Sequence, residues 1–385
     1  MMPASPAPRR VLAAMSGGVD SGVAAALLAE QGHALTGVTL KLWCYGKSPL
    51  SERACCSIDA IEDARRVART MNFPHFVVEA EEVFRSRVLQ PFLEDYSHGR
   101  TPYPCALCNQ HLKFGDLVAR MDVMGLDALC TGHYARIGTL EDGSKALLTA
   151  RDPAKDQSYA LALIPYAVLS RVMFPLGDLE KPVVRAHGER LGLSVWDKPE
   201  SMDLCFVPDG DYAGFMVKHL GVTRGTEPGP MLDEQGRRIG THRGIIHYTV
   251  GQRKGLGIAA AEPLYVLAVD AGRDALIVGP RAALESTGLV TAPMNWLMAA
   301  PPAAGTRVEA RIRAHHTPAS ASVTPKADGS VELTFDQPQA AVTPGQLCVL
   351  YQGERVLGGA SIAHALPVRE LLPAPVAQAL IPLHA

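Results

Sequence analysis

Met15-Ser16-Gly17-Gly18-Val19-Asp20-Ser21 is the stretch that decides the fold of the N-terminal half of this chain. An apolar run at 10–15 precedes it and predicts a short strand, and the strong helix former GVAAALLAE follows at 22–30. A glycine turn between a strand and a helix lets the backbone approach phosphate groups, and the helix N-terminus offers them N–H donors. The run therefore predicts a phosphate-binding loop.

The polar side chains of this loop suit a nucleotide. Ser16 and Ser21 can donate hydroxyl hydrogen bonds, and Asp20 can help to hold a magnesium ion. A tight turn with a serine cap is the alternative, but the complete string after an apolar strand favours phosphate binding. The loop lacks the G-x-x-x-x-G-K-[ST] pattern of enzymes that transfer the γ-phosphate. We therefore expect ATP to serve a different reaction here.

Strand and helix patterns alternate through the first half of the chain. Further strands are predicted at 34–43, 75–78 and 126–134, and helices at 57–71, capped by Ser57, and near 81–96. A loop is predicted at 97–107, which carries a glycine and two prolines. Strict alternation is typical of an α/β fold with a doubly wound parallel sheet.

The second half of the chain changes character after about residue 209. Residues 221–261 are glycine-rich, and short β runs follow at 307–314, 321–325, 331–335 and 347–352, with a hairpin turn at 327–329. This pattern predicts a C-terminal β-barrel. We expect three domains: an α/β domain at 1–209, a small central domain at 210–284 and the barrel at 285–385, with poor order from about residue 371.

Composition narrows the class of protein. The chain has 385 residues, of which 47% are hydrophobic and 20% charged, enough to bury several cores. No apolar run reaches the length of a membrane span, and the first ten residues lack the apolar core of a secretory signal. We therefore expect a cytoplasmic protein without a membrane partner, whose eight cysteines are mostly reduced. Cys130 and Cys348 lie in apolar runs and are predicted core residues.

Two other cysteines, Cys108 and Cys205, stand among polar, turn-forming residues. Cys108 follows Cys105 in a segment that is predicted to lead into a helix, and a thiol at a helix N-terminus has a lowered pKa. Burial as a small hydrophobic residue is the alternative for either thiol alone. Paired thiols beside an ATP loop indicate sulfur insertion. Cys44, Cys55 and Cys56 flank a polar loop, where reactive or metal-binding roles are possible but an incidental role is favoured.

A second nucleotide contact is predicted at Thr131-Gly132-His133-Tyr134, where the fourth strand ends. Ligands of such sheets collect beyond the carboxyl ends of the strands. Gly132 would allow close approach to the adenylate, whereas His133 is either functional or an ordinary capping residue.

Residues 235–261 contain no acidic residue and are expected to contact RNA phosphates, with aromatic side chains available for stacking. The basic residues there are Arg237, Arg238, Arg243, Arg253 and Lys254, interleaved with His242, His247 and Tyr248. The alternative is that these residues form a solvated charged face without an RNA partner. A weaker basic patch is predicted in the barrel, at Arg307, Arg311, Arg313, His315 and His316.

Several short sequence motifs occur along the chain in a defined order. They are SGGVDS at 16–21, GRTPYP with a later CN at 99–109, TGHY at 131–134, KDQSY at 155–159, SMDLCF at 201–206, GQRKGLG at 251–257 and VTPGQ at 342–346. The first resembles the loop of the PP-loop ATP pyrophosphatases, which cleave ATP between its α and β phosphates. The full series resembles the tRNA-specific 2-thiouridylases of the MnmA family over nearly the whole chain.

This resemblance implies a reaction. ATP would adenylate the C2 oxygen of the wobble uridine in a tRNA anticodon stem-loop and release pyrophosphate. Cys205 would carry sulfur as a persulfide, received from a donor protein or a sulfide source, and its terminal sulfur would attack C2. Cys108 would then resolve the intermediate and leave a Cys108–Cys205 disulfide. Adenylation fits this scheme because it turns a poor oxygen leaving group into a good one.

The resemblance also implies binding residues. For ATP with Mg²⁺ they are Ala14, Met15, Ser16, Gly17, Gly18, Val19, Asp20, Ser21, Leu40 and Gly132. For tRNA they are Tyr103, Pro104, Cys105, His133, Lys155, Asp156, Gln157, Arg313 and Gln346. The family's Arg-Tyr pair falls on Arg313-Ala314, so its aromatic half is missing.

Cys105 departs from the family, in which many members carry an aspartate with an acid–base role. Together with Cys108 and Cys205 it could hold a [4Fe–4S] cluster with one open iron that delivers sulfide. We keep this hypothesis beside the persulfide route, with a structural zinc or a simple redox pair as lesser alternatives. Two other classes compete: an amidating PP-loop synthetase, which needs no paired thiols, and a non-catalytic RNA-binding protein, which needs no SGGVDS loop.

Overall fold

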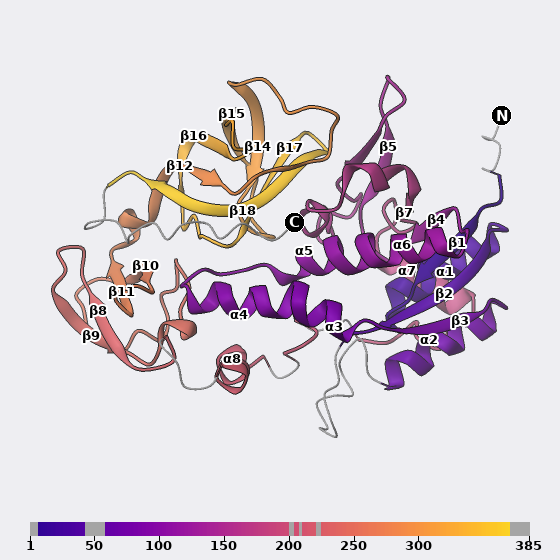
Figure 1. The fold of residues 1–385 in the computed structure, drawn as a ribbon, viewed down its shortest axis with the longest axis horizontal. Helices are drawn as coiled ribbons and strands as arrows, with labels where there is room; N and C mark the ends of the chain where they lie inside the picture. Colours follow the sequence, from indigo (N-terminus) through magenta and orange to yellow (C-terminus); the bar gives the residue numbers. More distant parts are fainter. Residues whose placement is uncertain (1–6, 43–57, 200–203, 208–209, 221–224, 370–385) are drawn as a thin grey trace.

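A computed structural model describes residues 7–42, 58–199, 204–207, 210–220 and 225–369. Figure 1 shows three parts: a parallel sheet with its helices, a small sheet at the opposite end of the long axis, and a barrel. Several predicted features lie outside the described residues, namely Cys44, Cys55, Cys56, the Ser57 cap, residues 201–203 and the tail from 371. Within the described residues, no helix is long and apolar enough to cross a membrane.

The predicted parallel sheet is confirmed. Its order is β3-β2-β1-β4-β7, and every neighbouring pair is parallel. The strands are β1 (Arg10–Ala14), β2 (Ala34–Lys41), β3 (His75–Glu79), β4 (Ala128–Cys130) and β7 (Val172–Met173). The sequence did not indicate β7, which has only two residues.

Helices cover both faces of this sheet, as a doubly wound fold requires. Side chains alternate along β1: Val11 and Ala13 join one apolar cluster with α1 (Val19–Glu30), whereas Leu12 joins the other with α6 (Leu117–Val123). The cluster with α1 also takes in residues of α2 (Ile58–Thr70) and α7 (Lys181–Arg190). Both faces are therefore packed cores, and the loops at the strand ends remain available for a site.

Two long helical runs continue from β3. The first combines α3 (Glu81–Phe84), η2 (Arg85–Leu89) and α4 (Gln90–Ser97), close to the predicted helix. The second combines α5 (Pro104–Cys108), η3 (Asn109–Asp116) and α6, in which η3 has the wider π-helical turn. The loop predicted at 97–107 is wrong in its second half, because the helix already begins at Pro104. Proline suits a first helical position, where its missing N–H would have no partner.

The small sheet has the order β10-β11-β8-β9. Its strands are β8 (Gly229–Leu232), β9 (Arg238–His242), β10 (Tyr265–Asp270) and β11 (Ala275–Gly279), preceded by α8 (Tyr212–Leu220). Short 3-10 turns occur at η6 (Ile245–His247) and η7 (Arg281–Leu284). Within the described residues 225–261 there are short strands and no long helix, which agrees with the prediction.

The C-terminal barrel is also confirmed. Strands run in the order β12-β16-β15-β14-β17-β18, and β12 pairs with β18 to close the ring. They are β12 (Glu285–Thr291), β14 (Thr306–Arg311), β15 (Ala319–Pro325), β16 (Val331–Ala340), β17 (Leu347–Gln352) and β18 (Arg355–Pro367), with β13 (Asn295–Trp296) paired to β18. The hairpin turn between β15 and β16 uses Asp328, whose Oδ1 accepts hydrogen bonds from Ser330 N and Oγ.

The two predicted core cysteines are confirmed. Cys130 on β4 is 1% exposed and Cys348 on β17 is fully buried. Burial raises the pKa of Cys348 to about 12, and it raises that of Cys130 as well. Both thiols are therefore protonated packing residues rather than nucleophiles.

The α/β part and the barrel share one sheet edge. A hairpin of β5 (Arg136–Thr139) and β6 (Lys145–Leu148), which the sequence did not indicate, pairs with β18 through Leu148 and Arg355. After it come η4 (Ser158–Leu161) and η5 (Tyr166–Arg171). Figure 1 shows β5 beside the barrel, between it and the parallel sheet. This edge pairing limits how far the two parts can move apart.

A buried ion pair reinforces the same junction. The Asp156 carboxylate, whose side chain is 3% exposed, accepts a hydrogen bond from Arg311 Nη1 on β14 at 2.9 Å. It also accepts from the backbone of Ala150 and Ser158 and from the Ser158 hydroxyl. The Arg311 guanidinium lies 4.7 Å from the centre of the Tyr351 ring. The local hydrogen bonds fix the carboxylate, and the bond from Arg311 joins it to the barrel.

We expect Arg311→Met to lower the free energy of unfolding by about 3 kcal/mol, because it leaves a buried carboxylate without its counter-charge. Arg307→Met is the matched control. Arg307 lies on the same strand and pairs with Asp336, but the side chains of both partners are exposed, so a much smaller loss is expected. Urea unfolding followed by tryptophan fluorescence measures both. Equal losses in the two variants would show that the junction pair is no stronger than a surface pair.

Candidate functional site

The phosphate-loop segment is a tight turn between β1 and α1. Gly17 has φ +72°, and a Cβ there would lie 2.1 Å from the carbonyl oxygen of Ala60 on α2. Only glycine fits such a position. The N-cap of α1 is Gly18, which has no side chain to cap the first N–H groups of the helix. This is the backbone arrangement that the sequence predicted.

The two loop serines are tied together. Ser21 Oγ accepts a hydrogen bond from Ser16 N at 3.0 Å, lies 3.1 Å from Ser16 Oγ and donates to the carbonyl of Gly18. The hydroxyls thus close the turn from inside. Ala14 and Leu40 lie near the carboxyl ends of the neighbouring strands β1 and β2, at the edge where such sheets bind ligands.

Asp20 occupies the first turn of α1 and is held from two sides. Its Oδ1 accepts a hydrogen bond from the Tyr134 hydroxyl at 2.8 Å and from Lys181 Nζ at 2.6 Å. Tyr134 is 2% exposed and Lys181 8% exposed. Sequence reasoning missed Lys181, because nothing near it in the chain marks a residue 161 positions away from the loop.

A second lysine fastens the loop. Lys198 Nζ donates to the carbonyl of Gly17 at 3.1 Å and to Asp63 Oδ2 on α2 at 2.6 Å. The Asp63 side chain is 11% exposed and also pairs with Arg66. The sequence predicted a role for neither Lys198 nor Asp63.

Gly132 is close to the loop, but for a different reason than predicted. A Cβ at this position would lie 2.5 Å from Ser21 N and 2.7 Å from the carbonyl carbon of Asp20. The close approach is therefore to the backbone of the loop itself. Gly132 lets the end of β4 pack directly on the phosphate loop.

His133, next to it, is buried. Its Nδ1 lies 2.7 Å from Thr131 Oγ1, and its Nε2 lies 3.4 Å from Lys113 Nζ on η3. Burial and the nearby Lys113 charge hold the pKa of His133 well below its ordinary value. The imidazole is therefore neutral at pH 7, with one ring nitrogen that donates a hydrogen bond and one that accepts.

Cys108 and Cys205 belong to one apolar cluster although they are far apart in the chain. Cys108 on α5 is buried, and Cys205, in the turn 204–207, is half-buried. Their cluster also contains Leu112 and Phe206, and the Phe206 ring meets Phe92 edge-on at 5.1 Å. The structure thus brings the two predicted thiols to one region, and Cys205 lies in the turn-like stretch that was expected.

Cys105 does not join this cluster. It lies in the first turn of α5 and is half-buried. Among the described residues, which include all three thiols, no group of three or more His, Cys, Asp or Glu side chains is arranged to hold a metal ion. No chemical step is therefore derived through an iron–sulfur cluster.

The predicted tRNA residues differ in accessibility. The carboxylate of Asp156 is used at the junction with the barrel, whereas Lys155 is half-buried and Gln157 is exposed. Gln157 Oε1 accepts a hydrogen bond from Tyr134 N. The Tyr103 ring meets the Tyr159 ring edge-on at 5.2 Å, and burial raises the pKa of its hydroxyl. Asp156 and Gln157 thus also have structural roles: Asp156 bonds to Arg311 of the barrel, and Gln157 bonds to the backbone of Tyr134.

Two predicted strings, GRTPYP and VTPGQ, meet at Thr101. Its N–H donates to the carbonyl of Pro344 at 2.9 Å, and its carbonyl accepts from Gln346 Nε2 at 3.1 Å. Its hydroxyl lies 3.4 Å from that of Thr249, just before the GQRKGLG string. The loop before α5 is therefore held by both the barrel and the central part of the chain.

The basic segment is only partly available to RNA. Arg238, Arg243, Arg253 and Lys254 are exposed, but Arg237 pairs with Asp233, just before the acid-free segment. The prediction that His242 and Tyr248 stack on bases is wrong, since they are 1% and 6% exposed and belong to the protein interior. His242 instead bonds the backbone at Asp274 and Gly244. In the barrel, Arg313 is exposed, while Arg307 and Arg311 are in ion pairs.

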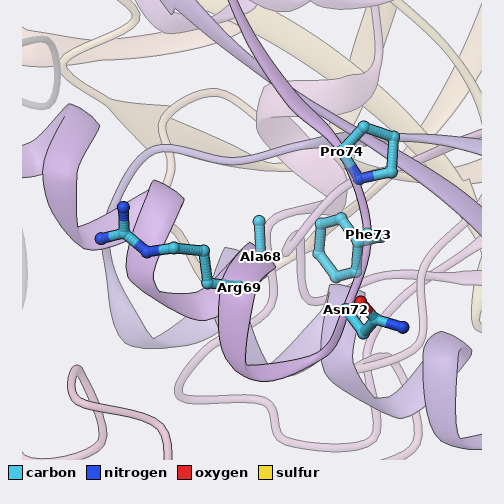
Figure 2. A pocket seen from close by; sticks show the side chains of 5 residues that line it. All are labelled: Ala68, Arg69, Asn72, Phe73 and Pro74. Atoms are coloured by element: carbon cyan, nitrogen blue, oxygen red, sulfur yellow. The ribbon is translucent and has the colours of Figure 1, made fainter.

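Figure 2 shows the side chains around an open hollow of about 380 Å³ at the end of α2: Ala68, Arg69, Asn72, Phe73 and Pro74. Asn72 has φ +56°, as is common where a helix turns into the next strand. None of the predicted site residues lines this hollow. It follows from the turn between α2 and β3.

Three family models match the chain in succession. The tRNA methyl transferase HUP domain matches residues 9–209, the tRNA methyl transferase PRC-barrel domain 215–280 and the aminomethyltransferase beta-barrel domain 286–362. Among solved structures, an NMN synthetase from Francisella tularensis has a TM-score of 0.34 at 18% identity, over 57% of this chain and 74% of that one. A score this low says nothing about chemistry.

Relatives of known name match almost from end to end. The chain is 47% identical over 356 residues to the tRNA-specific 2-thiouridylase MnmA of Magnetococcus marinus, which covers 91% of this chain and 98% of the relative. It is 46% identical over 364 residues to the protein of the same name from Geotalea uraniireducens, with 93% and 96% covered. These matches show that the chain belongs to the MnmA family of tRNA-specific 2-thiouridylases.

Proposed function

We propose that this chain is a tRNA-uridine 2-sulfurtransferase that uses ATP to replace the C2 oxygen of the wobble uridine by sulfur. One observation carries the proposal: Cys108 and Cys205 share an apolar cluster in the α/β part of the chain that also holds the SGGVDS loop. An amidating synthetase would need the loop but has no use for paired thiols. Membership of the MnmA family supports the same choice.

The first half of the reaction is activation. The C2 oxygen of the uridine attacks the α-phosphorus of ATP, the bond to the β-phosphate oxygen breaks, and pyrophosphate leaves with the electron pair. The N–H groups at the start of α1 and the exposed Ser16 hydroxyl would bind phosphate oxygens, while the Ser21 hydroxyl, which donates to the Gly18 carbonyl, keeps the turn closed. Mg²⁺ neutralises phosphate charge when bound, and one carboxylate, here that of Asp20, fits the donor set that Mg²⁺ uses beside phosphates.

The second half is sulfur transfer. The terminal sulfur of a Cys205 persulfide attacks C2, and AMP leaves with the original oxygen. The Cys108 thiolate then attacks the Cys205 sulfur, which releases 2-thiouridine and forms a Cys108–Cys205 disulfide. A dithiol reductant must restore both thiols, and a sulfur-donor protein or sulfide source must reload Cys205. The apolar cluster that Cys108 and Cys205 share supports this pairing.

We further propose that tRNA lies across all three parts, divided at 1–209, 210–284 and 285–385. Lys155 and Gln157 would meet the anticodon stem-loop from the α/β part, and Arg313 and Gln346 from the barrel. Tyr103, Pro104 and Cys105 would contact the target base at the start of α5. The exposed Arg253 and Lys254 support phosphate contacts by the small sheet.

We expect Cys205→Ser to abolish 2-thiouridine formation, measured by mass spectrometry of tRNA nucleosides, because serine cannot carry the persulfide. ATP binding should be unchanged, since the phosphate loop does not include this turn. Cys348→Ala, a substitution of a thiol inside the barrel, is the matched control and should retain activity. Thiolation by Cys205→Ser would overturn the proposed sulfur transfer.

We expect Asp20→Asn to slow tRNA-dependent pyrophosphate release by about 100-fold, because a carboxylate that holds the metal is lost. Binding of tRNA should persist. A non-catalytic RNA-binding protein predicts no pyrophosphate release in either form. Release that is equal in the wild type and in Asp20→Asn would contradict the role of this loop.

Iron content separates the two sulfur routes. We expect protein purified without oxygen to be active without stoichiometric iron, because the three thiols do not gather as a ligand group. About four iron and four sulfide per chain, lost together in Cys105→Ala, would instead establish a cluster. Iron analysis and acid-labile sulfide on the same active sample decide the matter.

A further inference from the structure

Lys181 is a buried cation beside the phosphate loop that the reaction scheme above does not use. Its side chain is 10% exposed, and its Nζ lies 2.6 Å from Asp20 Oδ1. The Tyr134 hydroxyl bonds the same oxygen at 2.8 Å, and the ammonium lies 5.8 Å from the centre of the Tyr134 ring. Side chains from α7, α1 and the TGHY string thus converge at the start of α1.

The position of this lysine is unfavourable for packing alone. Burial of an ammonium costs free energy unless it is paired, and an apolar side chain of the same length would fill the space without that cost. Lys181 is also the first residue of α7, where the helix dipole disfavours a cation. Its own backbone N–H is bonded to Asp152 Oδ2. A charge kept in such a place indicates a role for the charge itself.

The other lysines near the loop have different surroundings. Lys198 donates to a loop carbonyl and to Asp63, which fastens the turn to α2. Lys113 lies beside the imidazole of His133. Lys181 alone among these three pairs with Asp20, the residue whose proposed partner is the metal of the nucleotide.

We propose that Lys181 binds the pyrophosphate portion of a nucleoside triphosphate and stabilises it as it leaves. This inference rests on the proposed function. When Asp20 turns to the metal, the ammonium of Lys181 is released to the phosphate oxygens, while Tyr134 keeps the carboxylate oriented. As the α–β bond breaks, the electron pair moves to the β-phosphate oxygen, and the ammonium meets the added negative charge. Lys181 is then a catalytic residue of the activation step.

The test is direct binding, without turnover. Pyrophosphate with Mg²⁺ is titrated calorimetrically into the wild type, Lys181→Met and Lys181→Arg, and Mn²⁺ binding without nucleotide is followed by electron paramagnetic resonance. We expect Lys181→Met to weaken pyrophosphate binding by about 10-fold or more, because a charged hydrogen bond is lost. It should strengthen Mn²⁺ binding, because Asp20 loses its competing cation. Lys181→Arg should restore most of the pyrophosphate affinity.

Lys326→Met is the matched control, since Lys326 forms an exposed pair with Glu332 in the barrel hairpin, and neither affinity should change. A purely structural role of Lys181 predicts that both affinities fall together as the loop loosens. Any of three results overturns the proposal. They are a fall of both affinities in Lys181→Met, an unchanged pyrophosphate affinity in that variant, or a wild type that binds no pyrophosphate. Suppose that Lys181→Met binds pyrophosphate more weakly and Mn²⁺ more tightly, but that the wild type does not thiolate tRNA. This outcome would support the role of Lys181 in pyrophosphate binding and would contradict only the proposed function.

Discussion

The buried carboxylate of Asp156 is the charge around which the α/β part and the barrel meet. Its bonds to Arg311 and Ser158 hold the turn after β6 against the barrel wall. The next residue, Gln157, exchanges hydrogen bonds with the backbone of Tyr134, whose hydroxyl reaches Asp20. A continuous series of contacts therefore runs from a barrel strand to the phosphate loop. The loop geometry depends on a junction that lies outside the loop.

Close backbone packing sets the loop as strongly as its hydrogen bonds do. Gly17 lies against Ala60 of α2, and Gly132 lies against the backbone of Asp20 and Ser21. A side chain at either position would push the loop away from its neighbours. The glycines thus provide a rigid base on which the N–H groups of α1 keep a fixed direction, as preorganised phosphate binding requires.

The thiol region depends on contacts between distant segments. Thr101 connects the loop before α5 to the barrel through Pro344 and Gln346 and to the central part of the chain through Thr249, so the start of α5 is fixed by two other parts of the protein. Phe206 brings the turn of Cys205 onto the cluster that contains Cys108. Both thiols therefore have an apolar side, which excludes water, and the half-buried Cys205 lies at its edge. Such a setting would suit the persulfide proposed above, which must be protected from solvent until it reacts.

The sequence by itself determined the elements whose signals are local. The apolar period of two or 3.6 residues located β1, α1 and most barrel strands, and the glycine turn located the phosphate loop. Local patterns failed where a feature was short or began unexpectedly, as with β7 and the first turn of α5. They also misplaced His242 and Tyr248 on the surface, because a residue type does not say which way its side chain points. Only the tertiary structure decided that Lys181 meets Asp20 and that Cys108 and Cys205 share one cluster, since contacts between residues a hundred or more positions apart arise from packing and leave no periodic mark in the chain.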